Sequence, residues 1–108
     1  MKKPKIVIID DEVEYIKDLS RGLEIMGYEV FKTVSGAGGI ELINREKPEI
    51  VLCDYKLGDM DGIQVIAKVK TTNPSTVYIM VTAYYDENFN EVFKKSLLVA
   101  KSQIKRAD

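Results

Sequence analysis

Residues 5–11 read KIVIIDD, an apolar run that ends in two adjacent acids. Two other runs have the same character, IVLC at residues 50–53 and VYIMV at residues 77–81. All three are continuous and rich in β-branched residues, which is typical of strands in a parallel sheet that is covered on both faces. Residues 28–34 alternate more clearly between apolar and polar positions, so we expect an edge strand there.

The segments between these runs place apolar residues at helical spacing. The first segment is followed by Gly27, a typical helix end, and the other two precede Pro48 and Pro74. The apolar positions are Ile16, Leu19, Leu23 and Met26; Ile40, Leu42 and Ile43; and Ile63, Ile66 and Val69. Strands that alternate with helices predict an α/β fold with a doubly wound parallel sheet and right-handed crossovers. In such sheets the functional residues lie at the carboxyl ends of the strands.

Length and composition indicate the class of protein. The chain has 108 residues, with 16 Lys and Arg against 17 Asp and Glu, and 45% of its residues are hydrophobic. These values predict a single globular domain over residues 1–108. The balanced charge gives no overall attraction to nucleic acid, and no apolar run is long enough for a transmembrane helix or a signal peptide. Since Cys53 is the sole cysteine, an internal disulfide is excluded, which suits the cytoplasm.

The chain contains no histidine. This absence excludes Ser-His and Cys-His nucleophilic machinery and the usual zinc ligand sets. A bound metal is therefore expected to be a hard cation held by oxygen ligands, such as Mg²⁺ or Ca²⁺.

Polar residues follow three of the predicted strands. Asp10 and Asp11 follow the first, Asp54 follows the second apolar run, and Thr82 follows the third. Because the carboxyl ends of parallel strands meet at one edge, the acids are expected to lie close together, where they repel unless a cation neutralises them. The cluster therefore predicts a Mg²⁺ site with an open face for phosphate. For each acid taken by itself, the alternative is a helix N-cap, with Asp11 capping a helix that starts near Glu12.

Three longer stretches together resemble the receiver domains of response regulators in two-component signalling. They are IVIIDDEVEY, VLCDYKLGDMDG and VYIMVTAY. The resemblance covers residues 5 to about 86, and the spacing from Asp54 to Thr82 also fits the family. It implies the flavodoxin-like receiver fold.

The resemblance implies a role for each residue of the cluster. Asp54 is the expected phosphoacceptor, whose carboxylate takes the phosphoryl group of a phosphohistidine or a small phosphodonor as an aspartyl phosphate. Asp11 and Asp54 are expected to ligate Mg²⁺ directly, with Asp10 acting largely through water. The backbone carbonyl of Lys56 is a further expected ligand. Thr82 is expected to turn its hydroxyl onto the new phosphoryl group and draw its loop inward. This conformational change is the expected switch.

The resemblance also implies partners and a compartment. The phosphoryl group is expected to come from a histidine kinase or a phosphotransfer protein, and the switch to act on a downstream output domain or partner protein. The expected chemistry is self-phosphotransfer and autodephosphorylation only, so the chain is not expected to be an enzyme. We expect a cytoplasmic domain with no membrane association and no direct binding of nucleic acid.

The C-terminal end departs from the family pattern, in which a fifth strand ends in Lys-Pro before a last helix. No Lys-Pro pair follows Thr82. One alternative is a short strand over residues 97–100, with Lys101 as the lysine that neutralises the phosphoryl charge. Only seven residues follow Lys101, too few for a normal last helix, so this end is expected to be atypical or shortened.

The other alternative is one long helix over residues 87–105. Its basis is the helical spacing of four apolar residues, Phe93, Leu97, Ala100 and Ile104. The sheet would then have four strands and an open edge, which a second copy could fill by homodimerisation through this C-terminal face. Lys105 is a weaker candidate for the neutralising lysine, and a fragment of a longer regulator would also explain the atypical end. The sequence leaves these alternatives open.

Two other functions compete with the phosphoacceptor. The first is a pseudo-receiver, a protein-interaction module on the same fold that is never phosphorylated. The altered C-terminus favours it, and the gathered acids oppose it. The second is a Mg²⁺-dependent phosphohydrolase that works through an aspartyl phosphate. Such enzymes usually carry Asp-x-Asp after the first strand, where this chain has the adjacent pair Asp10 and Asp11.

Overall fold

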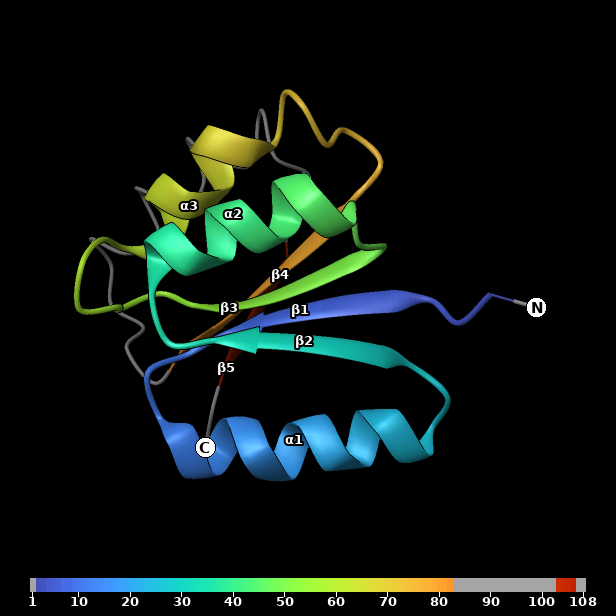
Figure 1. Cartoon of the computed structure of the whole chain (residues 1–108). Helices are drawn as coiled ribbons and strands as arrows, with labels where there is room; N and C mark the ends of the chain where they lie inside the picture. The colour runs from blue at the N-terminus through green and yellow to red at the C-terminus, as the bar shows by residue number, and fades with distance from the viewer. Residues whose placement is uncertain (1, 83–102, 107–108) are drawn as a thin grey trace.

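The computed structural model describes residues 2–82 and 103–106. Within them, strands and helices alternate along the chain, as the sequence predicts (Figure 1). The elements are β1 (Lys5–Ile9), α1 (Val13–Ile25), β2 (Glu29–Thr33), α2 (Gly36–Glu46), β3 (Ile50–Asp54), α3 (Gly62–Val69), β4 (Val77–Thr82) and β5 (Gln103–Arg106). All strand pairs are parallel, and the five-stranded sheet has the order β2-β1-β3-β4-β5. The prediction of a doubly wound α/β sheet is therefore confirmed.

Helices cover the sheet on opposite faces. Helix α1 lies against one face, and α2 and α3 lie side by side on the other (Figure 1). The burial of β1 on both faces explains its continuous apolar run. Its residues Val7 and Ile9 are buried in the cluster on the α2 and α3 side, while Ile6 and Ile8 are buried with Ile16 of α1. A strand buried on both faces needs apolar side chains at every position, so alternation disappears.

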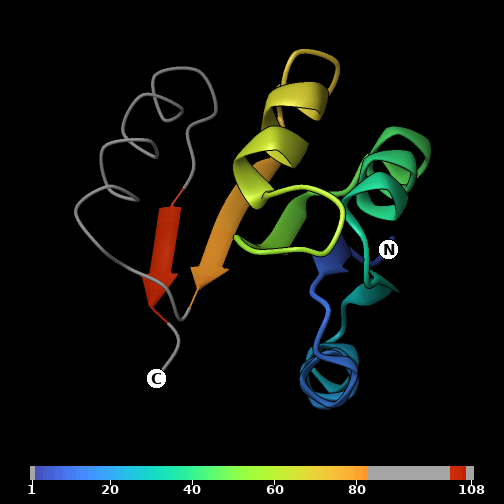
Figure 2. The same cartoon turned by 90° about the vertical axis from the view of Figure 1, so that its left-hand side faces the viewer.

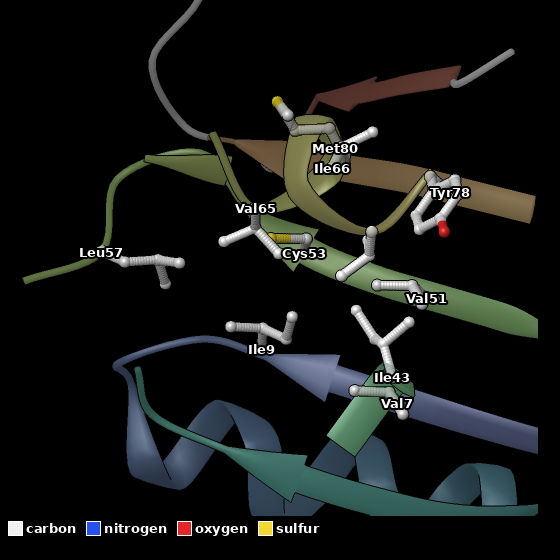
Figure 3. Packing of buried hydrophobic residues seen from close by; sticks show 11 residues of the cluster. Val7, Ile9, Ile43, Val51, Cys53, Leu57, Val65, Ile66, Tyr78 and Met80 are labelled. Atoms are coloured by element: carbon white, nitrogen blue, oxygen red, sulfur yellow. The ribbon is translucent and has the colours of Figure 1, made fainter. Parts of the chain in front are cut away.

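The larger of the two hydrophobic clusters supports the carboxyl edge of the sheet (Figure 3). It joins β1, β3 and β4 to α2 and α3 through Ile9, Val51, Ile43, Val65 and Met80, each 0% exposed. Cys53 of β3 belongs to the same cluster, and its burial raises the pKa of the thiol. This core fixes the strand ends from which the acids project.

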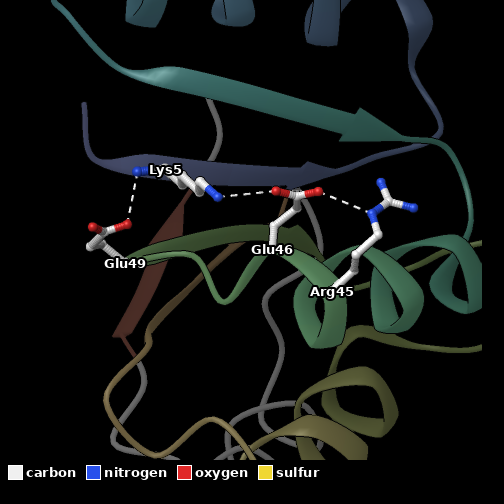
Figure 4. Close-up of polar contacts among 4 residues, drawn as sticks. All are labelled: Lys5, Arg45, Glu46 and Glu49. Carbon is white, nitrogen blue, oxygen red and sulfur yellow. Dashed lines mark hydrogen bonds and ion pairs between the residues drawn. The ribbon is translucent and has the colours of Figure 1, made fainter. Parts of the chain in front are cut away.

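A polar cluster fastens the opposite, amino-terminal edge (Figure 4). Lys5 Nζ lies 3.1 Å from Glu46 Oε1 at the end of α2, and Arg45 Nε donates to Glu46 Oε2 at 3.0 Å. The Lys5 backbone N–H also donates to Glu49 Oε1 at 2.8 Å. Polar bonds of this kind near the surface contribute little energy each, but they join the start of β1 to α2 and to the start of β3.

Strand β2 is an edge strand, as predicted from residues 28–34. It pairs with β1 alone among the described strands, with Lys5 opposite Glu29 and Ile9 opposite Thr33. Gly27, the predicted helix end, follows α1 with a φ of +102°, a left-handed conformation that favours glycine.

The C-terminal predictions need correction. Gln103–Arg106 form β5, parallel to β4, with Gln103 opposite Ile79 and Arg106 opposite Thr82. A helix extending to residue 105 is therefore wrong over residues 103–105, and so is a four-stranded sheet. The alternative strand over residues 97–100 and the candidate Lys101 lie outside the described residues. Lys105 lies within β5, opposite Val81.

Gly62, the first residue of α3, should not tolerate a side chain. A Cβ there would lie 2.6 Å from the backbone oxygen of Asp54 and 3.1 Å from Met80 Cε. Because a backbone atom cannot rotate away, we expect Gly62→Ala to lower the free energy of unfolding by about 1–3 kcal/mol. Urea unfolding followed by far-UV circular dichroism measures this change.

Gly22→Ala is the matched control. Gly22 lies inside α1, is exposed, and has no atom within 4 Å of the position that a Cβ would take. Alanine there should raise stability by up to about 1 kcal/mol through helix propensity. Equal stabilisation by both substitutions would contradict the close approach at Gly62.

Candidate functional site

The three acids converge because β1 and β3 are neighbours in register. Ile9 pairs with Cys53, so the residues that follow them leave the same edge of the sheet. Carboxylate oxygens of Asp10, Asp11 and Asp54 all lie within 4.8 Å of one another. The structure thus brings together the acids that the sequence places at strand ends. Figure 2 views this edge, with the loop after β3 in yellow-green near its centre.

Burial and mutual repulsion perturb two of these carboxyls. Burial, and then the charge of Asp10, raise the pKa of Asp54 to about 6, although N–H groups of Tyr55 and Lys56 donate to this carboxylate and oppose the shift. Asp10 is 8% exposed, and burial also raises its pKa. A cation placed among the three acids would relieve both penalties.

Only one of the acids takes part in starting α1. The N-cap position of this helix is Glu12, not Asp11, and its side chain makes no capping hydrogen bond. Asp10 Oδ1 instead accepts from the backbone N–H of Glu12 at 2.9 Å. The capping alternative for Asp11 is therefore wrong, and capping does not explain why the acids gather.

A polar cleft of about 580 Å³ opens beside the acids. Its lining residues are Asp11, Glu12, Asp54, Lys56, Leu57 and Gly58. The cleft has room for a hydrated cation and a phosphoryl group, and Lys56 lies on its wall.

The loop after β3 is closed by short-range bonds. The backbone N–H of Gly62 donates to the carbonyl of Tyr55 at 2.7 Å, and Lys56 and Asp61 form an antiparallel bridge. Asp61 then caps α3, because its carboxylate accepts from the Gln64 N–H while the Gln64 side chain accepts from the Asp61 N–H. The Asp61-Gly62 pair thus has a structural role at the start of α3.

Thr82 ends β4 at the same edge. Val81 is the register partner of Asp54, so Thr82 lies one residue beyond that pair. The backbone therefore places Thr82 beside the acids.

Tyr15 is a neighbour of the site that sequence reasoning missed. It lies on the first turns of α1, and its pKa is raised by burial and by the charges of Asp10 and Asp54. Its position in the sequence could have identified it, because Tyr15 comes four residues after Asp11, one helical turn beyond the acids.

Comparisons with known proteins show the family. The model of the response regulator receiver domain family matches residues 6–97. Sporulation initiation phosphotransferase F of Bacillus subtilis (strain 168) is 31% identical over 84 residues, which are 78% of this chain and 68% of that protein. A response regulator receiver domain protein (CheY-like) from Methanospirillum hungatei JF-1 has a TM-score of 0.87 and 27% identity, over 99% of this chain and 85% of that one. This chain belongs to the response regulator receiver domain family of two-component systems.

A further solved structure is similar in fold and sequence. It is a response regulator protein from Burkholderia pseudomallei with a phosphorylated aspartic acid, calcium ion and citrate. The TM-score is 0.83 and the identity 25%, over 94% of this chain and 59% of that one. The chain spans only 18–19% of the length of the transcriptional regulatory proteins that it matches. Within residues 2–82 and 103–106, no helix is both long and apolar enough to cross a membrane.

Asp54 should make the metal-free protein less stable as the pH rises. Its folded-state pKa of about 6 lies above the ordinary value of 3.8, so the folded protein holds this proton more tightly than the unfolded chain. The stability that this proton contributes is therefore full below pH 3.8 and is lost as the pH rises from 3.8 to about 6. We expect Asp54→Asn to raise the free energy of unfolding by about 1–2 kcal/mol near neutral pH, discounted for solvent screening, and by much less near pH ~4.

Urea unfolding in the presence of EDTA at both pH values measures this difference. Asp18→Asn, which removes an exposed carboxylate of α1, controls for the lost charge. A variant at Asp54 that gains no stability over the wild type at neutral pH would contradict the prediction.

Proposed function

We propose that this chain is the phosphoacceptor domain of a two-component or phosphorelay system. In this proposal Asp54 takes the phosphoryl group from the phosphohistidine of a histidine kinase or phosphotransfer protein. The observation that carries it is the convergence of the acids within 4.8 Å, beside a cleft of about 580 Å³. Phosphoryl transfer needs a cation beside the acceptor, and this cluster offers the ligands for one.

The proposed transfer is a displacement at phosphorus. A carboxylate oxygen of Asp54 attacks the phosphorus atom, a P–O bond forms, and the P–N bond to the imidazole breaks. The electron pair stays on the imidazole nitrogen, which takes up a proton. Since the pKa of Asp54 is about 6, most of this carboxyl is ionised near neutral pH, as a nucleophile must be. The N–H groups of Tyr55 and Lys56 orient it.

Mg²⁺ fits the donors of this site. Asp11 and Asp54 would bind it directly, and Asp10 largely through water. The backbone carbonyl of Lys56, a residue on the cleft wall, would be a further ligand. When bound, the ion neutralises the carboxylates and polarises the phosphoryl oxygens. The similar protein with a phosphorylated aspartic acid and a calcium ion supports this assignment.

Two further residues complete the proposal. Thr82 is the switch residue, whose hydroxyl bonds the new phosphoryl group, and its place at the end of β4 supports this role. Lys101 neutralises the phosphoryl charge, with Lys105 of β5 as the second candidate. The change at Thr82 then biases its loop between two positions, which a partner reads.

The whole protein's partners belong to the proposal too. The chain covers 18–19% of the matched transcriptional regulators, so a downstream output domain or partner protein is proposed as the recipient of the switch. A cytoplasmic setting and homodimerisation through the C-terminal face are also proposed. The pseudo-receiver alternative rests on the missing Lys-Pro pair, and the convergence of the acids argues against it.

Incubation with a small phosphodonor, followed by intact-mass spectrometry and peptide mapping, tests the function. We expect one phosphoryl group to be added, only when Mg²⁺ is present, and the modified peptide to contain Asp54. Asp54→Asn should abolish the addition, because the amide is not a nucleophile for phosphorus. Asp11→Asn should reduce it strongly by weakening the metal site.

Asp18→Asn serves as the control again, since it removes an acid outside the cluster. A folded wild-type protein that gains no mass in the presence of Mg²⁺ would exclude the phosphoacceptor and favour the pseudo-receiver. Addition to a residue other than Asp54 would contradict the assignment of the acceptor.

A further inference from the structure

Asp59, an acid of the loop after β3, binds the start of helix α2. Asp59 Oδ1 accepts from the backbone N–H of Gly36 at 2.8 Å, and its Oδ2 accepts from that of Ala37 at 2.9 Å. Both donors are at the start of α2, where the helix dipole also favours a negative charge. These N–H groups lower the pKa of Asp59.

The next residue of the loop makes an independent contact with the same helix start. The side chain of Met60 lies over Gly36, where an added Cβ would clash with Met60 Cγ and lie 2.8 Å from Met60 Sδ. Glycine at position 36 thus allows the loop to approach the helix closely. Two consecutive loop residues are fitted to one residue of α2.

Helix α2 does not need Asp59 as its cap. Ser35 occupies the N-cap position, and its hydroxyl accepts from the Gly38 N–H at 3.0 Å. Asp59 uses two other N–H groups of the first turn, and it reaches them from a segment 23 residues further along the chain. Its bonds therefore join two separate segments of the chain, in addition to the capping that Ser35 provides.

The position of Asp59 in the loop gives these bonds a consequence for the site. The loop leaves Asp54, passes Lys56 and Gly58 on the cleft wall, and reaches Asp59. Leu57 packs in the larger hydrophobic cluster, whereas Gly58 is exposed and a Cβ there would meet nothing within 4 Å. The anchor that follows is the pair of bonds from Asp59 to α2.

We propose that Asp59 is a positioning residue, which holds the loop after β3 against α2 and thereby keeps the Lys56 backbone in place for the cation. The effect on the cation rests on the proposed function. The effect on the loop does not, because it concerns the metal-free protein.

Two substitutions separate positioning from simple loss of stability. Asp59→Asn keeps the shape of the side chain but points an amide donor at one of the two N–H groups. Ser35→Ala removes the cap of the same helix without touching the loop, and lowers stability. Mg²⁺ binding measured by calorimetry should weaken about tenfold in Asp59→Asn and stay unchanged in Ser35→Ala. A tenfold loss is at the lower end of the range for substitutions of residues that support metal ligands.

Amide hydrogen exchange of the metal-free protein gives the second measurement. The Gly62 N–H, which bonds the Tyr55 carbonyl across the loop, should exchange about tenfold faster in Asp59→Asn than in the wild type or in Ser35→Ala. Unchanged exchange in Asp59→Asn, or an equal increase in Ser35→Ala, would overturn the proposal. If the wild type bound no Mg²⁺, the proposed function would fail, and the exchange measurement would still decide whether Asp59 holds the loop.

Discussion

Repulsion among Asp10, Asp11 and Asp54 is the constraint on which the rest of this structure depends. Three carboxylates with oxygens within 4.8 Å of one another would separate in a flexible chain. They stay together here because they follow β1 and β3, which are neighbours in register and are held in the core by buried residues such as Val7 and Val51. The free energy gained by burying the strands exceeds the electrostatic cost of the cluster. That cost is relieved by a proton or a cation, which makes the site responsive to either.

The loop after β3 shows how closely the rest of the chain is fitted to this cluster. The carbonyl of Asp54 itself forms the wall against which Gly62 packs, so Asp54 and the start of α3 cannot move independently. Glycine is needed there because of a close approach, since its φ lies outside the left-handed region. A further bond, from the Gly62 N–H to the Tyr55 carbonyl, closes the loop beside the cleft. These contacts therefore fix the backbone of the loop beside the three acids.

The parts that sequence predicted well are those fixed by local pattern. The bounds of β1 match the apolar run, and β3 and β4 each extend one residue past theirs, because continuous runs rich in β-branched residues give a strong signal for strands. The acids were found because they follow those strands. Strand β5 was missed because Ile104 is its one apolar residue and also fits a helical spacing with Ala100. Asp59 was missed as an anchor because its partners lie 23 residues away, and no local pattern encodes a bond of that range.

The topology also explains why an acidic site can be surrounded by helix starts. In a sheet of parallel strands each crossover helix begins at the carboxyl edge, so α1, α2 and α3 all direct their amino termini toward the side where the acids lie (Figure 2). The partial positive charge of those ends offsets part of the repulsion. Asp10 uses this directly by accepting from the Glu12 N–H, and Asp59 does so at α2. Asp54 ends β3 and Asp59 lies five residues later in the loop that follows. The bonds from Asp59 to Gly36 and Ala37 therefore tie the loop that leaves Asp54 to the start of α2.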